Sequence, residues 1–191
     1  MKNYLKLLSI ILFTIVLTSC NSDDDTPVPV NEEEVITTVI ATFVPQGGGT
    51  SVTLQSTDLD GDGPNEPVFT ISGSFASNSN YSGSVQFLNE LESPADDITE
   101  EVQEEALEHQ IFYSATSGIG GFTYNDLDSE GNPIGISFSF QSVNTSDSIN
   151  GTITITLRHE PNKDGEGVSE GNIANAGGDT DIQVTFNVTV Q

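Results

Sequence analysis

The chain has little positive charge, few thiols and no tryptophan. Its 191 residues contain four Lys and Arg against 29 Asp and Glu, together with one Cys. A formal net charge of −25 repels nucleic acid, anionic lipid headgroups and anionic substrates, and it attracts cations, so nucleic-acid binding is excluded. One Cys cannot form a disulfide within the chain. The scarcity of aromatic platforms also disfavours a sugar-binding surface.

Motifs for catalysis are missing as well. The sequence has no G-x-S-x-G, no Walker-type loop and no H-E-x-x-H, and a Ser-His-Asp triad would have to use His109 or His159. Acidic residues are too abundant to single out a glycosidase pair. We therefore expect a protein that is not an enzyme.

The chain has one long apolar run, and it lies at the N-terminus. The run extends from Leu7 to Leu17 and follows the basic residues Lys2 and Lys6. It is too short to span a bilayer as a helix, but a basic start followed by such a run is typical of a secretory signal peptide. We expect residues 1–19 to be this signal.

The only cysteine follows the apolar run directly. Leu17, Thr18, Ser19 and Cys20 resemble the lipobox of bacterial lipoproteins. This resemblance implies that the Cys20 sulfur carries a diacylglyceryl group, that the signal is cleaved before Cys20 and that the new amino terminus is acylated, for example with palmitate. Two or more acyl chains hold a protein stably on a membrane. The alternative is a buried free cysteine that happens to follow a signal peptide.

Residues 20–33 are expected to form an acidic tether after the lipidated cysteine. The stretch from Asn21 to Glu34 has six acids and two prolines and no periodic apolar face, so it should reach at most about 45 Å. Its Asp run resembles the export signals of surface-exposed lipoproteins in flavobacteria and their relatives. We expect an outer-membrane protein on the cell surface, with a periplasm-facing lipoprotein as the alternative. Cleavage would leave two basic residues against 29 acids, a formal charge of −27.

Residues 34–191 are long enough for one domain, and their pattern is that of strands. Alternating β-branched runs recur between turn residues, most clearly in GTITITLRH, where Ile153, Ile155, Leu157 and His159 share one face. The nine expected strands are roughly 34–44, 50–57, 67–75, 81–89, 110–115, 121–125, 134–142, 148–159 and 180–190. Eight or nine such strands predict an all-β fold, an antiparallel two-sheet sandwich of immunoglobulin-like general form. A closed β-barrel is the alternative.

One segment has the period of a helix instead. It runs over about 94–109, with Ser93 as its expected N-cap and Pro94 as its first helical residue. Ile98, Val102, Ala106 and His109 fall on one side of it. We expect this amphipathic helix to pack on the sandwich.

Two loops have the spacing of calcium ligands. Both begin D-L-D and continue to an acid and a glycine, a pattern that resembles the start of EF-hand loops. The bidentate Glu of that family is missing, because Phe69 and Ser137 stand at its positions, and ordinary acidic turns are the alternative. The candidate ligands are Asp58, Asp60, Asp62 and Glu66 in the first loop and, less strongly, Asp126, Asp128 and Glu130 in the second.

A zinc site is the second hypothesis. Glu105 and His109 are four residues apart on the expected helix, and His159 ends a strand directly before Glu160. If the helix packs over that end of the sandwich, these four side chains form an N2O2 site for zinc or a similar metal. Alternatively, both histidines make only local hydrogen bonds.

A wider resemblance indicates a location in the cell envelope but says little about function. The lipobox, the DGDGPNEP loop, the EEALEHQ segment and LRHEPNK are similar to small flavobacterial lipoproteins of unknown function, which are often labelled as type 1 periplasmic binding fold proteins. That fold is a larger α/β architecture and does not suit this strand pattern. Asp147-Ser148-Ile149 also resembles an O-glycosylation motif of such bacteria, which makes Ser148 a weak candidate against a plain loop serine.

These observations lead to one expectation about function and one alternative. We expect a lipid-anchored, non-catalytic envelope protein that binds calcium, zinc or a small ligand and serves an outer-membrane transporter. The alternative is a structural or protein-interaction module at the surface, in which the acidic loops are only solvated turns and no metal is bound.

Overall fold

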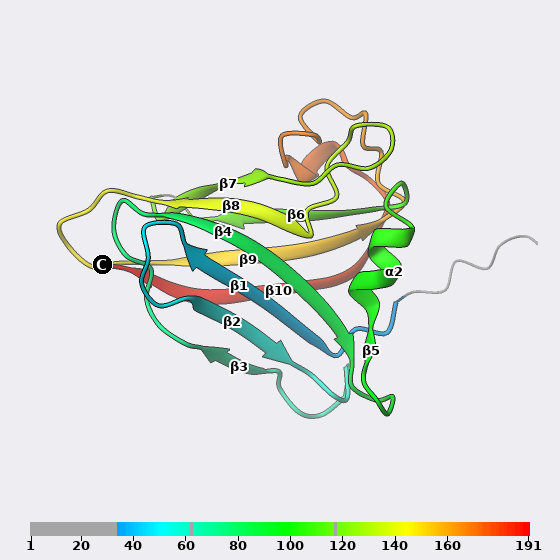
Figure 1. The fold of residues 1–191 in the computed structure, drawn as a ribbon. Helices are drawn as coiled ribbons and strands as arrows, with labels where there is room; N and C mark the ends of the chain where they lie inside the picture. The colour runs from blue at the N-terminus through cyan, green and yellow to red at the C-terminus, as the bar shows by residue number, and fades with distance from the viewer. Residues whose placement is uncertain (1–33, 62, 117) are drawn as a thin grey trace, which may run out of the picture. The chain divides into compact units, whose positions relative to one another are not determined.

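The computed structural model describes residues 34–191 except 62 and 117 (Figure 1). The expected signal peptide, Cys20, the tether and Asp62 lie outside the described residues. Contacts divide the chain into two compact units, of which Glu33–Gln191 is one. The core described below lies entirely within this unit, so a fragment that begins at Asn21 contains the whole fold. Among the described residues, no helix is long and apolar enough to cross a membrane.

Strands form at all nine places where alternation predicts them. A tenth, β5, is a two-residue strand that the sequence pattern does not indicate. The strands are β1 Thr38–Pro45, β2 Val52–Thr57, β3 Val68–Ile71, β4 Asn80–Asn89, β5 Asp96–Asp97, β6 His109–Ala115, β7 Gly120–Tyr124, β8 Ser137–Ser142, β9 Ile149–His159 and β10 Asp179–Val190.

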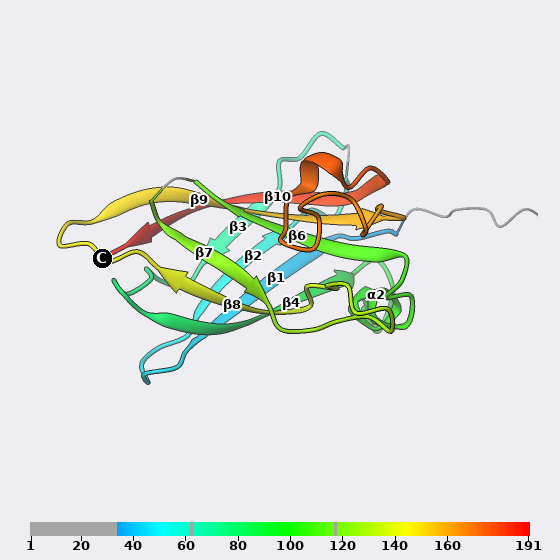
Figure 2. The ribbon, with the colours of Figure 1, turned by 90° about the horizontal axis from the view of Figure 1, so that it is seen from above.

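The strands form two antiparallel sheets that face each other (Figure 2). One sheet has seven strands in the order β3-β2-β1-β4-β8-β7, with β5 paired to β4, and the other has three in the order β10-β9-β6. The expected two-sheet sandwich is therefore confirmed, and the alternative of a closed barrel is wrong. Antiparallel strands with one face inward explain the alternation, for example in β4, where every second residue is buried.

Aromatic rings fill the space between the sheets. Phe43 of β1 lies at their centre, with its ring centroid 4.9 Å from that of Phe75, 5.2 Å from Phe138 and 5.7 Å from Phe140. Each fully buried side chain of this kind contributes about 1.5–3 kcal/mol to folding. Gly83 of β4 makes this packing possible, because a Cβ atom there would collide with the Phe138 ring.

The helix lies over one end of the sandwich, where β6 begins and β9 ends (Figure 1). It is shorter than expected: α2 spans Ile98–Glu104, and Asp97 is its N-cap, accepting a hydrogen bond from the Thr99 amide at 3.1 Å. Ser93 and Pro94 are not its cap and first residue, because Asp97 pairs with Leu88 of β4 and the helix begins only after that pair. The expected burial of Ile98 and Val102 is confirmed.

Candidate metal centre

Strand register brings the two histidines together. His109 begins β6, His159 ends β9, and the two are direct partners across the antiparallel pair. Their ring centroids lie 4.6 Å apart with an angle of 33° between the planes. Both residues are buried, with 0% and 7% of their surface exposed. Residues 50 positions apart thus face the same small volume under α2.

A third side chain reaches this volume from β10. Thr180 pairs with Arg158 and Ile182 pairs with Leu157, so Asp181 is an extra residue between two consecutive partners of β9. Such a β-bulge bends the strand and redirects a side chain. The Asp181 side chain is 0% exposed although its backbone is partly accessible, so it points inward as its neighbour Ile182 does.

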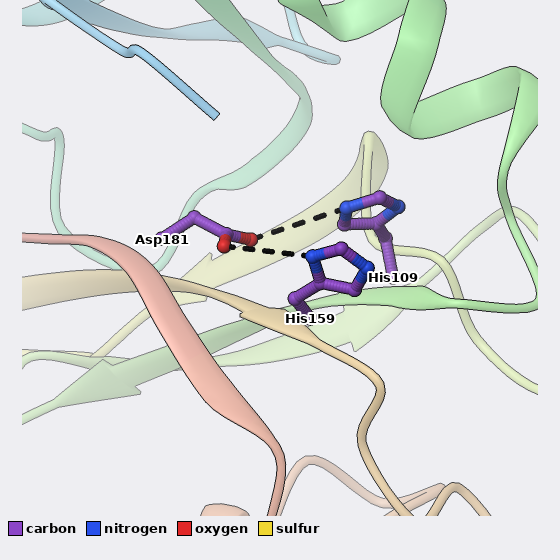
Figure 3. A group of neighbouring side chains, drawn as sticks. All are labelled: His109, His159 and Asp181. Atoms are coloured by element: carbon purple, nitrogen blue, oxygen red, sulfur yellow. Dashed lines mark ion pairs between the residues drawn. The ribbon is translucent and has the colours of Figure 1, made fainter. Parts of the chain in front are cut away.

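The carboxylate of Asp181 faces both imidazole rings from one side, with one oxygen toward each ring (Figure 3). Its Oδ2 is 4.0 Å from His109 Nε2, and its Oδ1 is 3.9 Å from His159 Nδ1. These distances are too long for direct hydrogen bonds between the carboxylate and the rings. Zinc binds imidazole nitrogen and carboxylate oxygen at about 2.0–2.2 Å, so two ligand atoms at the tetrahedral angle are about 3.3–3.6 Å apart, and the carboxylate and the rings would move together by about 0.5 Å on binding. His109, His159 and Asp181 therefore form a group that could bind a metal ion.

The outer ring nitrogens face other acceptors. His109 Nδ1 lies 3.3 Å from the carbonyl oxygen of Glu105, where α2 has just ended. His159 Nε2 lies 3.9 Å from the Glu108 carboxylate. A proton on each outer nitrogen leaves the inner nitrogen with a free lone pair, as metal-binding histidines require. His109 Nε2 and His159 Nδ1 make no hydrogen bond within the described part of the chain.

Electrostatics favour the form of His109 that binds metals. Burial lowers the pKa of His109 below 6.5, and the neighbouring His159 lowers it further, while the Glu105 carbonyl opposes both effects. His109 is therefore neutral at physiological pH, and only a neutral imidazole coordinates a metal. Nearby, burial and then the charges of Glu101, Asp181 and Glu105 raise the pKa of Glu34 to about 7. The Glu34 carboxyl is therefore partly protonated near neutral pH, and a cation bound nearby would favour its charged form.

The four residues of the expected zinc site lie at this end but do not converge on one point. Glu105 groups with Glu34 and His109, whereas Glu160 groups with Glu108 and His159. Glu105 lies 4.0 Å from the outer nitrogen Nδ1 of His109, Glu160 lies in the group at His159, and Asp181 is the carboxylate that faces both rings.

Asp181 is the residue of the candidate site that the sequence pattern did not predict. In a regular strand, Ile182, Val184 and Phe186 face the core and Asp181 faces solvent, and period-two alternation assigns it there. Only the bulge turns it inward. The sequence contains only a weak signal for Asp181. It is a short acidic residue that directly precedes the apolar face of a strand, and this strand pairs with the one that ends at His159.

The first expected calcium loop is described only in part, because Asp62 lies outside the described residues. Asp58 accepts a hydrogen bond from the Asp60 amide at 3.3 Å, and Asp60 accepts two from Asn65, the shorter at 2.6 Å. Glu66 is exposed. These bonds are those of an acidic turn, and calcium there stays a prediction.

In the second expected calcium loop, the carboxylates of Asp126 and Asp128 have protein partners. Asp126 accepts from the amides of Gly135 and Ser137, both at 2.8 Å. Asp128 accepts from the amides of Glu130 and Asn132 at 2.9 Å. The Lys163 ammonium lies 2.8 Å from the second oxygen of Asp128 and neutralises it. These partners satisfy the carboxylates of Asp126 and Asp128 without a bound ion. Glu130 is exposed.

Ser148 is exposed in the turn before β9, where the expected glycosylation remains a prediction.

Comparison with protein families, with curated proteins and with solved structures finds no match to this chain. The geometry at His109, His159 and Asp181 is therefore the main guide to function.

Proposed function

We propose that the protein is a lipid-anchored, non-catalytic component of the cell envelope that binds a transition-metal ion, zinc above all, at His109, His159 and Asp181. One observation carries this proposal: two imidazoles and a carboxylate, brought from three strands, are buried around one point. The inner ring nitrogens, His109 Nε2 and His159 Nδ1, are buried and make no hydrogen bond within the described residues, and a divalent cation would give both of them a partner.

The ligand types decide which ions fit. Calcium takes six to eight oxygen ligands, whereas imidazole nitrogens suit zinc, copper, iron and nickel. Two histidines and one carboxylate also hold non-haem iron(II) in other proteins. Zinc is preferred here because it needs no redox partner and accepts a compact four-coordinate site.

The N-terminal sequence and the charge support a location for the proposed metal binding. The lipobox ending at Cys20 supports attachment to the outer membrane, and the acidic residues after it support exposure at the cell surface. A protein with a formal charge of −25 raises the local concentration of cations. A metal-binding protein that assists an outer-membrane transporter would be consistent with both the membrane attachment and the negative charge.

The test measures metal in the fragment from Asn21 to Gln191. We expect zinc to copurify at one ion per chain and to raise the thermal midpoint when it is added to the chelated protein. At a hundredfold excess over the dissociation constant the gain is about 2.7 kcal/mol. For a domain of this size it corresponds to roughly 5–11 °C. Asp181→Asn should abolish most of this shift.

Asp179→Asn is the matched control, because Asp179 is the exposed register partner of His159 and carries the same charge. It should leave the zinc-dependent shift unchanged. If no added transition metal moves the midpoint of the unmodified fragment, the proposal is overturned. In that case the histidines are structural, and the interaction module is the better account.

A further inference from the structure

The strand β10 forms one edge of the three-stranded sheet, and the middle of its outer edge has no neighbouring strand. On the side away from β9, the Thr189 carbonyl accepts a hydrogen bond from the Phe75 amide at 2.9 Å. Backbone groups of alternate residues in a strand point to the same side, so those of Gln183, Thr185 and Asn187 also point away from β9. Within the part of the chain that the structure describes, no strand pairs with these three residues on that side.

The opposite edge of the same sheet is protected, whereas the β10 edge is not. At the opposite edge, the Ile111 amide of β6 donates to the Ile134 carbonyl at 2.7 Å, and its carbonyl accepts from the Tyr124 hydroxyl at 2.9 Å. Proteins usually protect an edge strand with such a cover, with charged side chains or with proline. The stretch from Ile182 to Val190 contains neither a charged residue nor a proline. It is therefore a template on which another strand can pair.

Exposed apolar side chains lie beside this edge. Phe69 and Ile71 of β3 pair with the buried residues Ser56 and Leu54 and so share the inner face of their sheet, yet they are 48% and 37% exposed. The Phe69 ring packs edge-on against Phe186 of β10, with 5.7 Å between the centroids. A strand added to β10 would therefore cover apolar surface as well as backbone groups.

The β10 edge is complementary to itself. The stretch without a neighbour is bounded by the bulge at Asp181 and by the contact at Thr189, so Thr185 is its centre. A second copy that runs antiparallel about a two-fold axis at Thr185 pairs this residue with its own copy and Gln183 with Asn187. Threonine pairs and amide pairs form hydrogen bonds across strands. The bulge of each copy then lies opposite the Thr189 contact of the other, so both strands stop pairing at the same points.

The charges also favour an antiparallel pair of copies. The acids of β10, Asp179 and Asp181, lie at the end of the strand beside His159. Antiparallel pairing puts these acidic ends at opposite ends of the junction, because Asp181 is four residues from the axis. The two copies of Asp181 are then about 27 Å apart, well beyond the Debye length of about 8 Å. Residues 182–190 bring no like charges face to face.

We propose that a second copy of this chain pairs with β10 and that the protein is a two-fold symmetric dimer. The two three-stranded sheets join into one continuous sheet of six strands. A two-fold axis normal to this sheet places both seven-stranded sheets on the same face of it, with β3 of each copy beside the junction. Phe69 and Ile71 are then covered. The dimer does not depend on the proposed metal binding.

Sedimentation of the fragment from Asn21 to Gln191 over a range of concentrations tests the dimer. We expect a monomer–dimer equilibrium in the unmodified fragment. Thr185→Lys should weaken it by about tenfold or more, because two like charges then face each other at the axis. Thr154→Lys is the matched control: the two hydroxyls share one hydrogen bond of 2.9 Å, so both variants lose it and gain the same charge. It should change dimerisation by less than about threefold, because its charges are separated by more than a Debye length.

A disulfide tests which residues meet. The fragment contains no cysteine, because Cys20 is the only one in the chain. Cα atoms of a hydrogen-bonded antiparallel pair are about 5.5 Å apart, a separation that a disulfide can span. Oxidation should therefore link Thr185→Cys into a covalent dimer. Thr154→Cys should stay unlinked, because three strand spacings, about 14 Å, separate its two copies.

Three outcomes overturn the proposal. A monomer at every soluble concentration shows that no second copy binds the edge, even if a strand of another protein does. A dimer that Thr185→Lys leaves intact and that forms no disulfide in Thr185→Cys uses another surface. A series of species larger than the dimer shows pairing without a closed two-fold axis. Thermal midpoints verify that each variant is folded.

Discussion

At the scale of single residues, Asp97 supports α2, the helix that ends beside the candidate metal site. Its carboxylate accepts from the Thr99 amide at 3.1 Å and from the Gln86 side chain at 2.8 Å. Burial raises the pKa of Asp97, but these hydrogen bonds outweigh it, so the pKa lies below 3.8. The carboxylate is therefore more stable in the folded chain than in the unfolded one, and it contributes stability at neutral pH.

We predict that Asp97→Ala lowers the free energy of unfolding by about 1 kcal/mol at pH 7, the usual value of an N-cap. Because the pKa is depressed, this contribution is fully present above 3.8 and is lost as the pH falls through the lower folded-state pKa. Urea unfolding at pH 7 and at successively lower pH would measure both effects.

Asp96→Ala is the control for this prediction. Asp96 has the same charge and is adjacent, but it is exposed and does not cap the helix. It should change the unfolding free energy by less than about 0.5 kcal/mol, as surface substitutions usually do. Equal losses in the two variants would show that charge, not capping, is responsible.

The sequence predicts part of the metal centre residue by residue. His159 lies on the inward face of an alternating strand, and His109 lies on the apolar side of the segment that was expected to be helical, so the two meet if that segment packs over the end of the sandwich. In fact His109 begins β6, which places it directly opposite His159. Asp181 gave no comparable signal, because its inward orientation depends on a strand register that is set by residues far away in the chain.

At the scale of elements, the bulge in β10 matters most for the site. A regular strand places every second residue inward, and that rule correctly predicts Val184, Phe186, Val188 and Val190 as core. The single extra residue at Asp181 turns both Asp181 and Ile182 inward at the end of the strand. Bulges are common beside functional sites, but their position is decided by pairing with the neighbouring strand, which the sequence of one strand does not reveal.

Lys163 connects three segments near the same end of the domain. Its ammonium donates to the carbonyl of Ala106 just after α2 at 2.5 Å, to Asp128 at 2.8 Å and to the carbonyl of Pro133 at 3.2 Å. The side chain is only 6% exposed. Removing one partner of a buried ion pair leaves the other charge uncompensated, which usually costs about 3–5 kcal/mol.

We predict that Lys163→Met lowers the free energy of unfolding of the metal-free fragment by about 3–5 kcal/mol. Arg158→Met tests whether loss of any cation from this acidic protein has the same effect. The Arg158 guanidinium donates exposed hydrogen bonds to the Gly177 carbonyl and the Thr180 hydroxyl. Its loss should therefore lower the free energy of unfolding by about 1 kcal/mol. Urea unfolding measures both, and similar losses would contradict a specific role for Lys163.

At the scale of the whole molecule, alternation and turn chemistry predict the strands and the two-sheet class. The order of strands within each sheet was not predictable, because it depends on long-range pairings such as β1 with β4 that no local pattern encodes. The helix was expected in the right place but was too long, since β5 uses residues that its cap pattern had assigned to the helix.

Attachment to the membrane is the last property to test, and it belongs to the full chain. We predict that the complete protein, made in a bacterium that processes lipoproteins, incorporates labelled palmitate and fractionates with the outer membrane. Cys20→Ser should lose the label and keep its signal, because the sulfur that receives the lipid is gone, whereas Ser19→Ala should behave normally, since it keeps a small residue before the cysteine. Palmitate in the Cys20→Ser protein would contradict this assignment. Replacing Asp23–Asp25 with Asn should preserve the label but reduce cleavage by protease added to intact cells, if these acids direct the protein to the surface.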